Sequence, residues 1–187
     1  MTSFLAHADV LLAIRALLAL IFLSASVAKM RHWAAFEGVV ANYRLLPRVL
    51  VPAVTYALPP VEAAIGSALL ASLVIPAEAL GFRASLAAGA LLGVFAVAMA
   101  VNLLRGRAHI DCGCFQGALK QTLRWPLVAR NGLLMLLMAA TSRQAMPPAT
   151  ASQLASGLMA GIALFMILQS FNALWAVKIE FRKRGAV

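Results

Sequence analysis

Five long apolar runs, separated by basic segments, constrain this 187-residue chain more than any other feature. They cover residues 10–30, 49–75, 84–104, 126–141 and 154–177. A helix needs about 20 mostly apolar residues to cross the hydrocarbon core of a bilayer, and four of the runs meet this length. The run at 126–141 is shorter and contains Arg130 and Asn131, so it could cross tightly or enter and turn back. We therefore expect an all-α, polytopic transmembrane bundle of five spans, with four spans as the alternative.

The composition supports the same class. Hydrophobic residues make up 63% of the chain and charged residues 12%, which excludes an ordinary soluble enzyme, a disordered chain and a secreted disulfide scaffold. No linker and no internal repeat divides the sequence, so residues 1–187 are expected to form a single integral membrane domain. The formal net charge of +10 does not indicate nucleic-acid binding, because the basic residues lie between the apolar runs. The bilayer is the expected partner of this charge.

The distribution of basic residues predicts an orientation. They gather after the first, third and fifth runs, at Lys29, Arg31, Arg44, Arg48, then Arg105, Arg107, Lys120, Arg124, then Lys178, Arg182, Lys183 and Arg184. Lysine and arginine are enriched in loops that remain in the cytoplasm. Five spans would then place the amino terminus outside the cell and the segment between the third and fourth runs in the cytoplasm.

Polar side chains gather toward one face of the predicted membrane domain. By counting spans, that face receives Lys29, Tyr43, Glu62, Asn102, Arg105, Asp111 and Arg130. Glu62 is the most costly, because a carboxylate within a transmembrane segment usually requires a partner inside the bundle. We expect Glu62 to pair with Lys29 or Arg130, either to fix helix packing or to take part in chemistry. Pro59-Pro60 is expected to kink or restart the helix, with Glu62 in the first turn of a restarted helix.

The sequence Cys112-Gly113-Cys114 contains both cysteines of the chain. Two thiols one residue apart can close a small ring if the backbone bends, and Gly113 permits the required dihedral angles. Such a ring is strained and easily reduced, which favours a redox-active dithiol. Binding of Cu(I) or Zn(II) by His109, Cys112 and Cys114, with Asp111, is an alternative, and two inert thiols are another.

One thiol pair cannot relay disulfides across a membrane alone. The sequence has no haem-attachment, dinucleotide-binding or phosphate-binding motif, so no cofactor is evident. A redox-active pair would have to exchange with a thiol partner and pass electrons to a second partner or to a quinone. The chain is therefore expected to be at most a thiol–disulfide oxidoreductase component.

A combination of short motifs carries a family resemblance. They are Lys29, Tyr43-Arg44-Leu45-Leu46-Pro47, Leu58-Pro59-Pro60-Val61-Glu62, Asn102-Leu103-Leu104-Arg105-Gly106, Asp111-Cys112-Gly113-Cys114-Phe115 and Arg130-Asn131. Together they resemble the MauE family of methylamine utilisation proteins, within the DoxX-like membrane proteins, over roughly residues 10–141. Many relatives have glycine directly after the phenylalanine, whereas Gln116 precedes Gly117 here.

The resemblance implies an accessory role in maturing methylamine dehydrogenase, at the bacterial inner membrane. The small subunit of that enzyme is periplasmic, rich in disulfides, and carries a tryptophan-derived quinone. The family is expected to assist its export, folding or disulfide formation beside a thioredoxin-like partner of the MauD type. The role that the resemblance implies fits the dithiol well and fits a cytoplasmic position of its loop less well. A metal-ion transporter or chaperone and a non-catalytic membrane scaffold are the alternative functions.

Overall fold

The computed structural model describes residues 8–75, 77–113, 122–142 and 150–184, with side chains described to Leu174. Within these residues the helices are α2 (Ala8–Arg31), α3 (Trp33–Tyr43), η1 (Arg48–Leu50), α4 (Val51–Val74), α5 (Glu78–Leu104), α6 (Trp125–Ser142) and α7 (Ala151–Arg184). No strand occurs among them, and only Asp111 and Thr122 form an isolated bridge. The expected all-α fold is confirmed.

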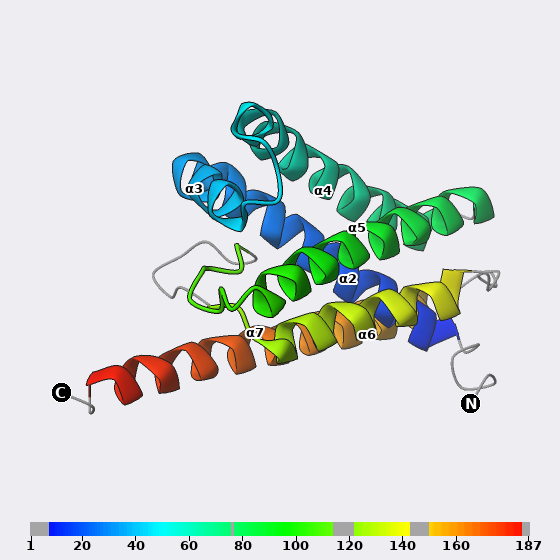
Figure 1. Ribbon diagram of the computed structural model, residues 1–187. Coiled ribbons are helices and arrows are strands. Elements are labelled where there is room, and N and C mark those ends of the chain that lie inside the picture. Colours follow the sequence, from blue (N-terminus) through cyan, green and yellow to red (C-terminus); the bar gives the residue numbers. More distant parts are fainter. Residues whose placement is uncertain (1–7, 76, 114–121, 143–149, 185–187) are drawn as a thin grey trace.

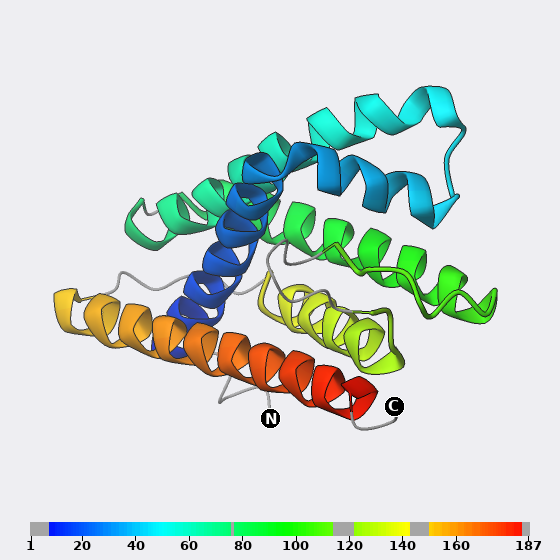
Figure 2. The same cartoon turned by 90° about the vertical axis from the view of Figure 1, so that its left-hand side faces the viewer.

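The long helices pack side by side, with α2 crossing the others obliquely, and α3 lies at one end of the bundle (Figures 1 and 2). Helix α2 packs on α4 and α7, and α5 packs on α6. Figure 2 shows α3 beside the first turns of α4. The largest apolar cluster joins α2, α4, α5 and α6 through buried side chains such as Phe22, Leu69, Leu92 and Met138. This core holds these four helices together.

Two glycines allow α7 to approach α2 closely. A Cβ on Gly161 would lie 2.6 Å from the Cβ of Ala16, and a Cβ on Gly157 would collide with the side chain of Leu12. Small residues four apart permit such contact between membrane helices, where van der Waals packing replaces the hydrophobic effect. The spacing Gly157-x-x-x-Gly161 is a sequence signal that predicts this interface.

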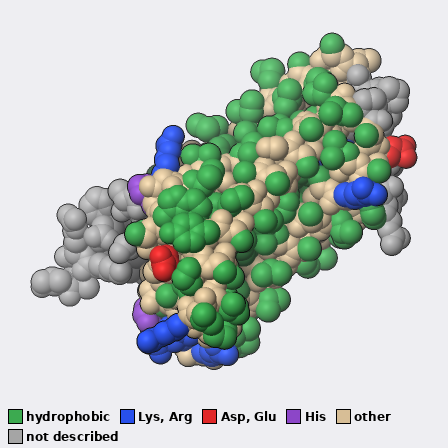
Figure 3. Space-filling view, turned by 90° about the horizontal axis from the view of Figure 1, so that it is seen from above, with side chains coloured by type: hydrophobic (Ala, Val, Ile, Leu, Met, Phe, Trp, Pro, Cys, Tyr) green, Lys and Arg blue, Asp and Glu red, His purple; other side chains and the backbone are tan. Residues whose placement is uncertain are grey.

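Four helical segments among the described residues are long and apolar enough to cross a membrane: Ala8–Arg31, Arg48–Val74, Glu78–Leu104 and Ala151–Leu174. Figure 3 shows apolar side chains over most of the visible face, with charged groups toward its ends. Helix α6 has 18 residues, or about 27 Å, and runs beside α5. The chain is therefore a multi-pass membrane protein, and whether α6 is a fifth span stays a prediction.

Hydropathy alone misplaced two boundaries. The connection between the first two apolar runs, predicted as a loop, contains α3, and Tyr43 is its last residue. Helix α5 begins at Glu78, well before the apolar run starts at residue 84. The helix dipole favours the Glu78 carboxylate in the first turn of α5. Its charge nevertheless excludes Glu78 from the apolar run that hydropathy detects. Glu78 lies between the apolar runs 49–75 and 84–104, where the sequence predicts a loop, and it is instead an exposed helical residue.

The expected restart of α4 at Pro59-Pro60 is wrong. Helix α4 continues from Val51 to Val74 with both prolines inside it, so Glu62 lies in the middle of α4. Each proline removes one N–H donor, but its fixed φ angle remains compatible with a helix. Packing against α2 supports this segment, where the Ser26 hydroxyl donates a hydrogen bond to the Pro59 carbonyl at 2.7 Å.

Candidate functional site

A buried ion pair joins α2 to α4. The Lys29 ammonium donates hydrogen bonds to both oxygens of the Glu62 carboxylate, the one to Oε2 at 2.7 Å. Lys29 is 3% exposed and Glu62 is 1% exposed. The expected pairing of Glu62 with Lys29 is confirmed. Removing either partner would leave the other charge buried, so this contact is a strong constraint on how the two helices pack.

Two aromatic rings enclose the Lys29 ammonium. Its Nζ lies 5.4 Å from the ring centroid of Phe36 in α3 and 5.5 Å from that of Phe95 in α5. A cation near the face of an aromatic ring is attracted by the ring's quadrupole. The ammonium is thus held by three helices besides its own. Neither phenylalanine could be identified from the sequence, because nothing there distinguishes them from other apolar residues.

Arg130 and Asn131 lie near the same ion pair, in the first half of α6. Together with Lys29 and Glu62 they line a small cavity of about 40 Å³. The Arg130 Nη1 donates to Asn172 Oδ1 of α7 at 3.4 Å, and the Asn131 amide donates to the Leu127 carbonyl. Arg130 therefore lies with Lys29 and Glu62, as the sequence predicted. Its hydrogen bond to Asn172 connects α7 to the same group of polar residues.

The carboxyl end of α3 is held by residues from the end of α5. Arg107 Nη1 donates to the Tyr43 carbonyl at 3.3 Å and to Asn102 Oδ1 at 3.2 Å. Arg105 makes a longer contact, 3.5 Å, with the Arg44 carbonyl. Basic side chains stabilise the exposed carbonyls and the negative end of a helix dipole. Arg107, which in the sequence indicates only the orientation in the membrane, thus positions α3.

The Cys112 turn folds back into the bundle. Tyr43 Oη donates to the Cys112 carbonyl at 3.0 Å, and the Gly113 N–H donates to Asp111 Oδ1 at 3.3 Å. Cys112 is 7% exposed and packs with Met99, Ile110 and Leu123. The predicted residues Tyr43, Asp111 and Cys112 therefore meet. Cys114 lies outside the described residues.

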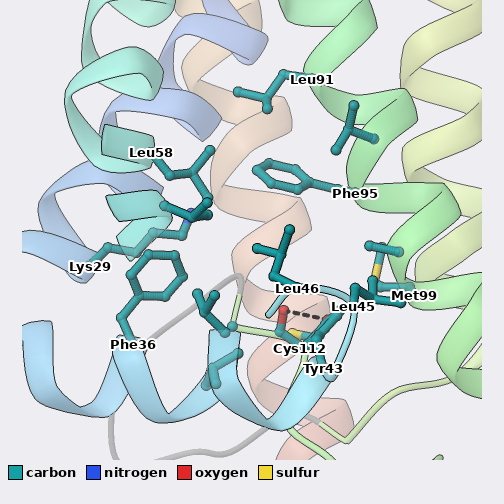
Figure 4. Close-up of a pocket in the computed structure, with 16 residues that line it drawn as sticks. Lys29, Phe36, Tyr43, Leu45, Leu46, Leu58, Leu91, Phe95, Met99 and Cys112 are labelled. Carbon is teal, nitrogen blue, oxygen red and sulfur yellow. Dashed lines mark hydrogen bonds between the residues drawn. The ribbon is translucent and has the colours of Figure 1, made fainter. Parts of the chain in front are cut away.

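An apolar cavity of about 310 Å³ lies between α3, α4, α5 and the Cys112 turn (Figure 4). Lys29 and Phe36 line one side of it, Phe95 lies across from them, and Cys112 lies at another side beside Tyr43. The remaining lining is mostly aliphatic, from residues such as Leu46, Leu58, Leu91 and Met99. The site thus combines one buried cation and one cysteine in the lining of an otherwise uncharged cavity.

The metal alternative finds no support in the described part of the chain. No group of three His, Cys, Asp or Glu side chains suited to a metal ion occurs there. His109 is exposed, whereas Cys112 is buried. Because Cys114 lies outside the described residues, a site formed by His109, Cys112 and Cys114 stays a prediction.

Gly113 should be indispensable for the Cys112 turn. Its φ angle is +70°, and a Cβ would lie 2.7 Å from Cγ1 of Val39 in α3. Left-handed backbone costs an L-residue roughly 1–2 kcal/mol, and here Val39 must also move. We expect Gly113→Ala, in a Cys114→Ser background, to increase the rate of Cys112 alkylation several-fold.

Gly106→Ala provides the matched control for this experiment. Gly106 has a φ angle of +72°, but a Cβ there would meet no heavy atom within 4 Å. The backbone penalty is shared, so a difference between the two variants reports the contact with α3. Equal alkylation rates would show that Gly113 does not hold the turn against Val39.

The fold and the site define a multi-pass α-helical membrane protein with a buried Lys–Glu pair and a cysteine turn at the same end of the bundle. The family model described as "Methylamine utilisation protein MauE" matches residues 7–143. The chain belongs to this family, and its role therefore lies in methylamine utilisation.

Individual relatives agree with the family match. A methylamine utilization protein MauE of Paracoccus denitrificans is 44% identical over 177 residues, covering 93% of this chain and 91% of the relative. The protein of the same name from Paracoccus versutus is 46% identical over 164 residues, covering 87% and 85%. That of Methylorubrum extorquens is 41% identical over 123 residues, covering 66% and 63%. No solved structure matches the chain.

Proposed function

We propose that the chain is a thiol–disulfide exchange component of the bacterial inner membrane that assists maturation of the methylamine dehydrogenase small subunit. The observation that carries the proposal is the position of Cys112, fixed by Tyr43 at the membrane domain's polar end and lining an apolar cavity. Membership of the MauE family indicates that the chain acts in methylamine utilisation. The disulfide-rich small subunit is a protein in that pathway whose disulfides a redox-active dithiol could help to form.

The proposed reaction moves two electrons and two protons from a partner to this chain. A thiolate of a MauD-type thioredoxin-like protein, or of the small subunit itself, attacks the Cys112–Cys114 disulfide and forms a mixed disulfide. A second thiol of the partner then closes the partner's own disulfide. Cys112 and Cys114 are left reduced, so a further oxidant must restore their disulfide before the next cycle.

Mass spectrometry of the intact protein tests the dithiol. Mild oxidation should remove two hydrogens, and a reductant should restore them. In the reverse exchange, the single thiol left in a Cys112→Ser or Cys114→Ser variant should attack the disulfide of an oxidised thioredoxin-like protein or of the small subunit. The mixed disulfide should accumulate, because this chain then has no second thiol to resolve it. Two unoxidised thiols under every non-damaging oxidant would overturn the proposal and favour the metal alternative.

Labelling in cells shows on which side of the membrane the Cys112 turn lies. Cys112 and Cys114 are labelled in intact cells with a membrane-impermeant maleimide, with and without reductant. Labelling from outside would support direct exchange with a periplasmic partner. Labelling only after the membrane is opened would support the orientation that the basic residues predict, with electrons passing through the membrane.

A further inference from the structure

We infer that the cavity between Lys29 and Cys112 binds the ring of a membrane quinone, which reoxidises the Cys112–Cys114 dithiol. This inference rests on the proposed function and names the oxidant that it requires. It is carried by the cavity's lining, by its position at the bundle surface, and by the two groups that face it.

The lining selects a neutral, lipophilic ligand. The volume of about 310 Å³ is at the lower end of the range for small-molecule sites, which suits one ring and excludes a folded peptide. Lys29 is the charged residue among the lining, and its charge is already matched by Glu62. An anionic or strongly hydrated electron acceptor would therefore lose its solvation without a compensating charge.

The cavity reaches the surface of the bundle where the side chains are apolar. Leu45, Leu46 and Val94 line it and are also exposed. Val94 belongs to α5, one of the helices long and apolar enough to span the membrane. A ligand can thus enter from the lipid, and a long isoprenoid tail can remain there while the ring occupies the cavity.

Lys29 provides a polar group that a quinone carbonyl can use. Two of the three N–H groups of its ammonium donate to Glu62. The third has no hydrogen-bond acceptor among the residues that the structure describes, and the Lys29 side chain is only 4% exposed. A quinone carbonyl oxygen would accept this hydrogen bond, which would orient the ring in the cavity. A lipid acyl chain would offer no acceptor.

The electron balance of the step is complete with a quinone. Cys112 and Cys114 lose two electrons and two protons and form one S–S bond. The quinone gains two electrons and two protons and becomes the quinol. Cys112 lines the cavity that would hold the quinone ring. Cys114 is included in the step because the sequence places it two residues after Cys112.

The test uses the full chain in nanodiscs of synthetic phosphatidylcholine free of quinone. The reduced protein is mixed with a short-tailed ubiquinone analogue, and quinol formation and thiol loss are followed together. Ala98 lines the cavity, so Ala98→Phe should fill it and raise the half-saturating quinone concentration at least about tenfold, which is about 1.4 kcal/mol. If Ala98→Phe fails to fold, Ala98→Leu replaces it in the test. It adds a smaller side chain and should raise the half-saturating quinone concentration by less.

Val97→Phe is the matched control, because Val97 is the preceding residue of α5 and is 63% exposed. It should behave like the unaltered chain. Equal effects of the two phenylalanines would overturn the inference. So would a chain whose disulfide is reduced by a thioredoxin-like dithiol but whose dithiol yields no quinol. Failure to form the disulfide with any oxidant would instead overturn the proposed function.

Discussion

Replacing Cys112 with serine is expected to abolish accumulation of the mature methylamine dehydrogenase small subunit, to the level of a strain that lacks this chain. The transcript of the small subunit should remain. A serine hydroxyl cannot form a disulfide and is not ionised at neutral pH. Thiol–disulfide exchange would therefore lose one of its two sulfur atoms. Serine has nearly the same shape, and the Tyr43 hydrogen bond goes to the backbone carbonyl, so the turn should persist. The measurement is an immunoblot of the small subunit under non-reducing conditions.

His109→Ala separates the thiol mechanism from the metal alternative. His109 is exposed in the same connection as Cys112, and no described hydrogen bond of the turn depends on it. Under the thiol mechanism this variant should mature the small subunit normally. Loss of maturation equal to that of Cys112→Ser would favour a metal site. Normal amounts of correctly bridged small subunit in a strain with both cysteines replaced would favour the scaffold function.

The fold class and the central ion pair could be predicted from the sequence because both follow from the cost of solvation in lipid. Runs of apolar residues this long have no stable place except a bilayer or a large core. A carboxylate within such a run requires a cation, and Lys29 ends the preceding run. Glu62 therefore had few possible partners, and in the structure it pairs with one of them, Lys29.

The cavity could not be predicted, because it depends on how a short segment folds back. Phe36 and Val39 belong to α3, which hydropathy assigned to a loop. Once Arg107 and Asn102 hold the end of α3 against α5, Phe36 reaches the Lys29 ammonium and Val39 meets Gly113. These contacts join positions far apart in the sequence, and apolar patterning carries no information about which apolar side chains meet.

The conformation of Gly113 was predicted in one respect only. The Cys-Gly-Cys spacing indicated that the turn needs unusual backbone angles, and the observed φ of +70° agrees. Its second role, leaving space for Val39, required knowledge of the tertiary structure. The continuous α4 was missed for the opposite reason, since local proline chemistry predicted a break that packing against α2 prevents.

Lys29→Met is expected to destabilise the folded chain by about 3–5 kcal/mol, because it leaves the Glu62 carboxylate buried among apolar groups without its cation. Glu62→Gln should be similarly damaging, since it leaves the ammonium. The double variant Lys29→Met/Glu62→Gln removes both charges and should recover most of the loss. The free energy of unfolding, measured by denaturing-detergent titration in mixed micelles, gives the coupling between the two sites.

Glu78→Gln is the control, because Glu78 is exposed at the start of α5 and should change stability by less than about 0.5 kcal/mol. Equal tolerance of Glu62→Gln and Glu78→Gln would contradict the importance of the pair. The double variant also separates packing from chemistry. If it folds like the unaltered chain and still matures the small subunit, the pair serves to dock α2 on α4. If it folds but quinol formation and maturation both fail, the ion pair is required for the chemistry as well as for packing.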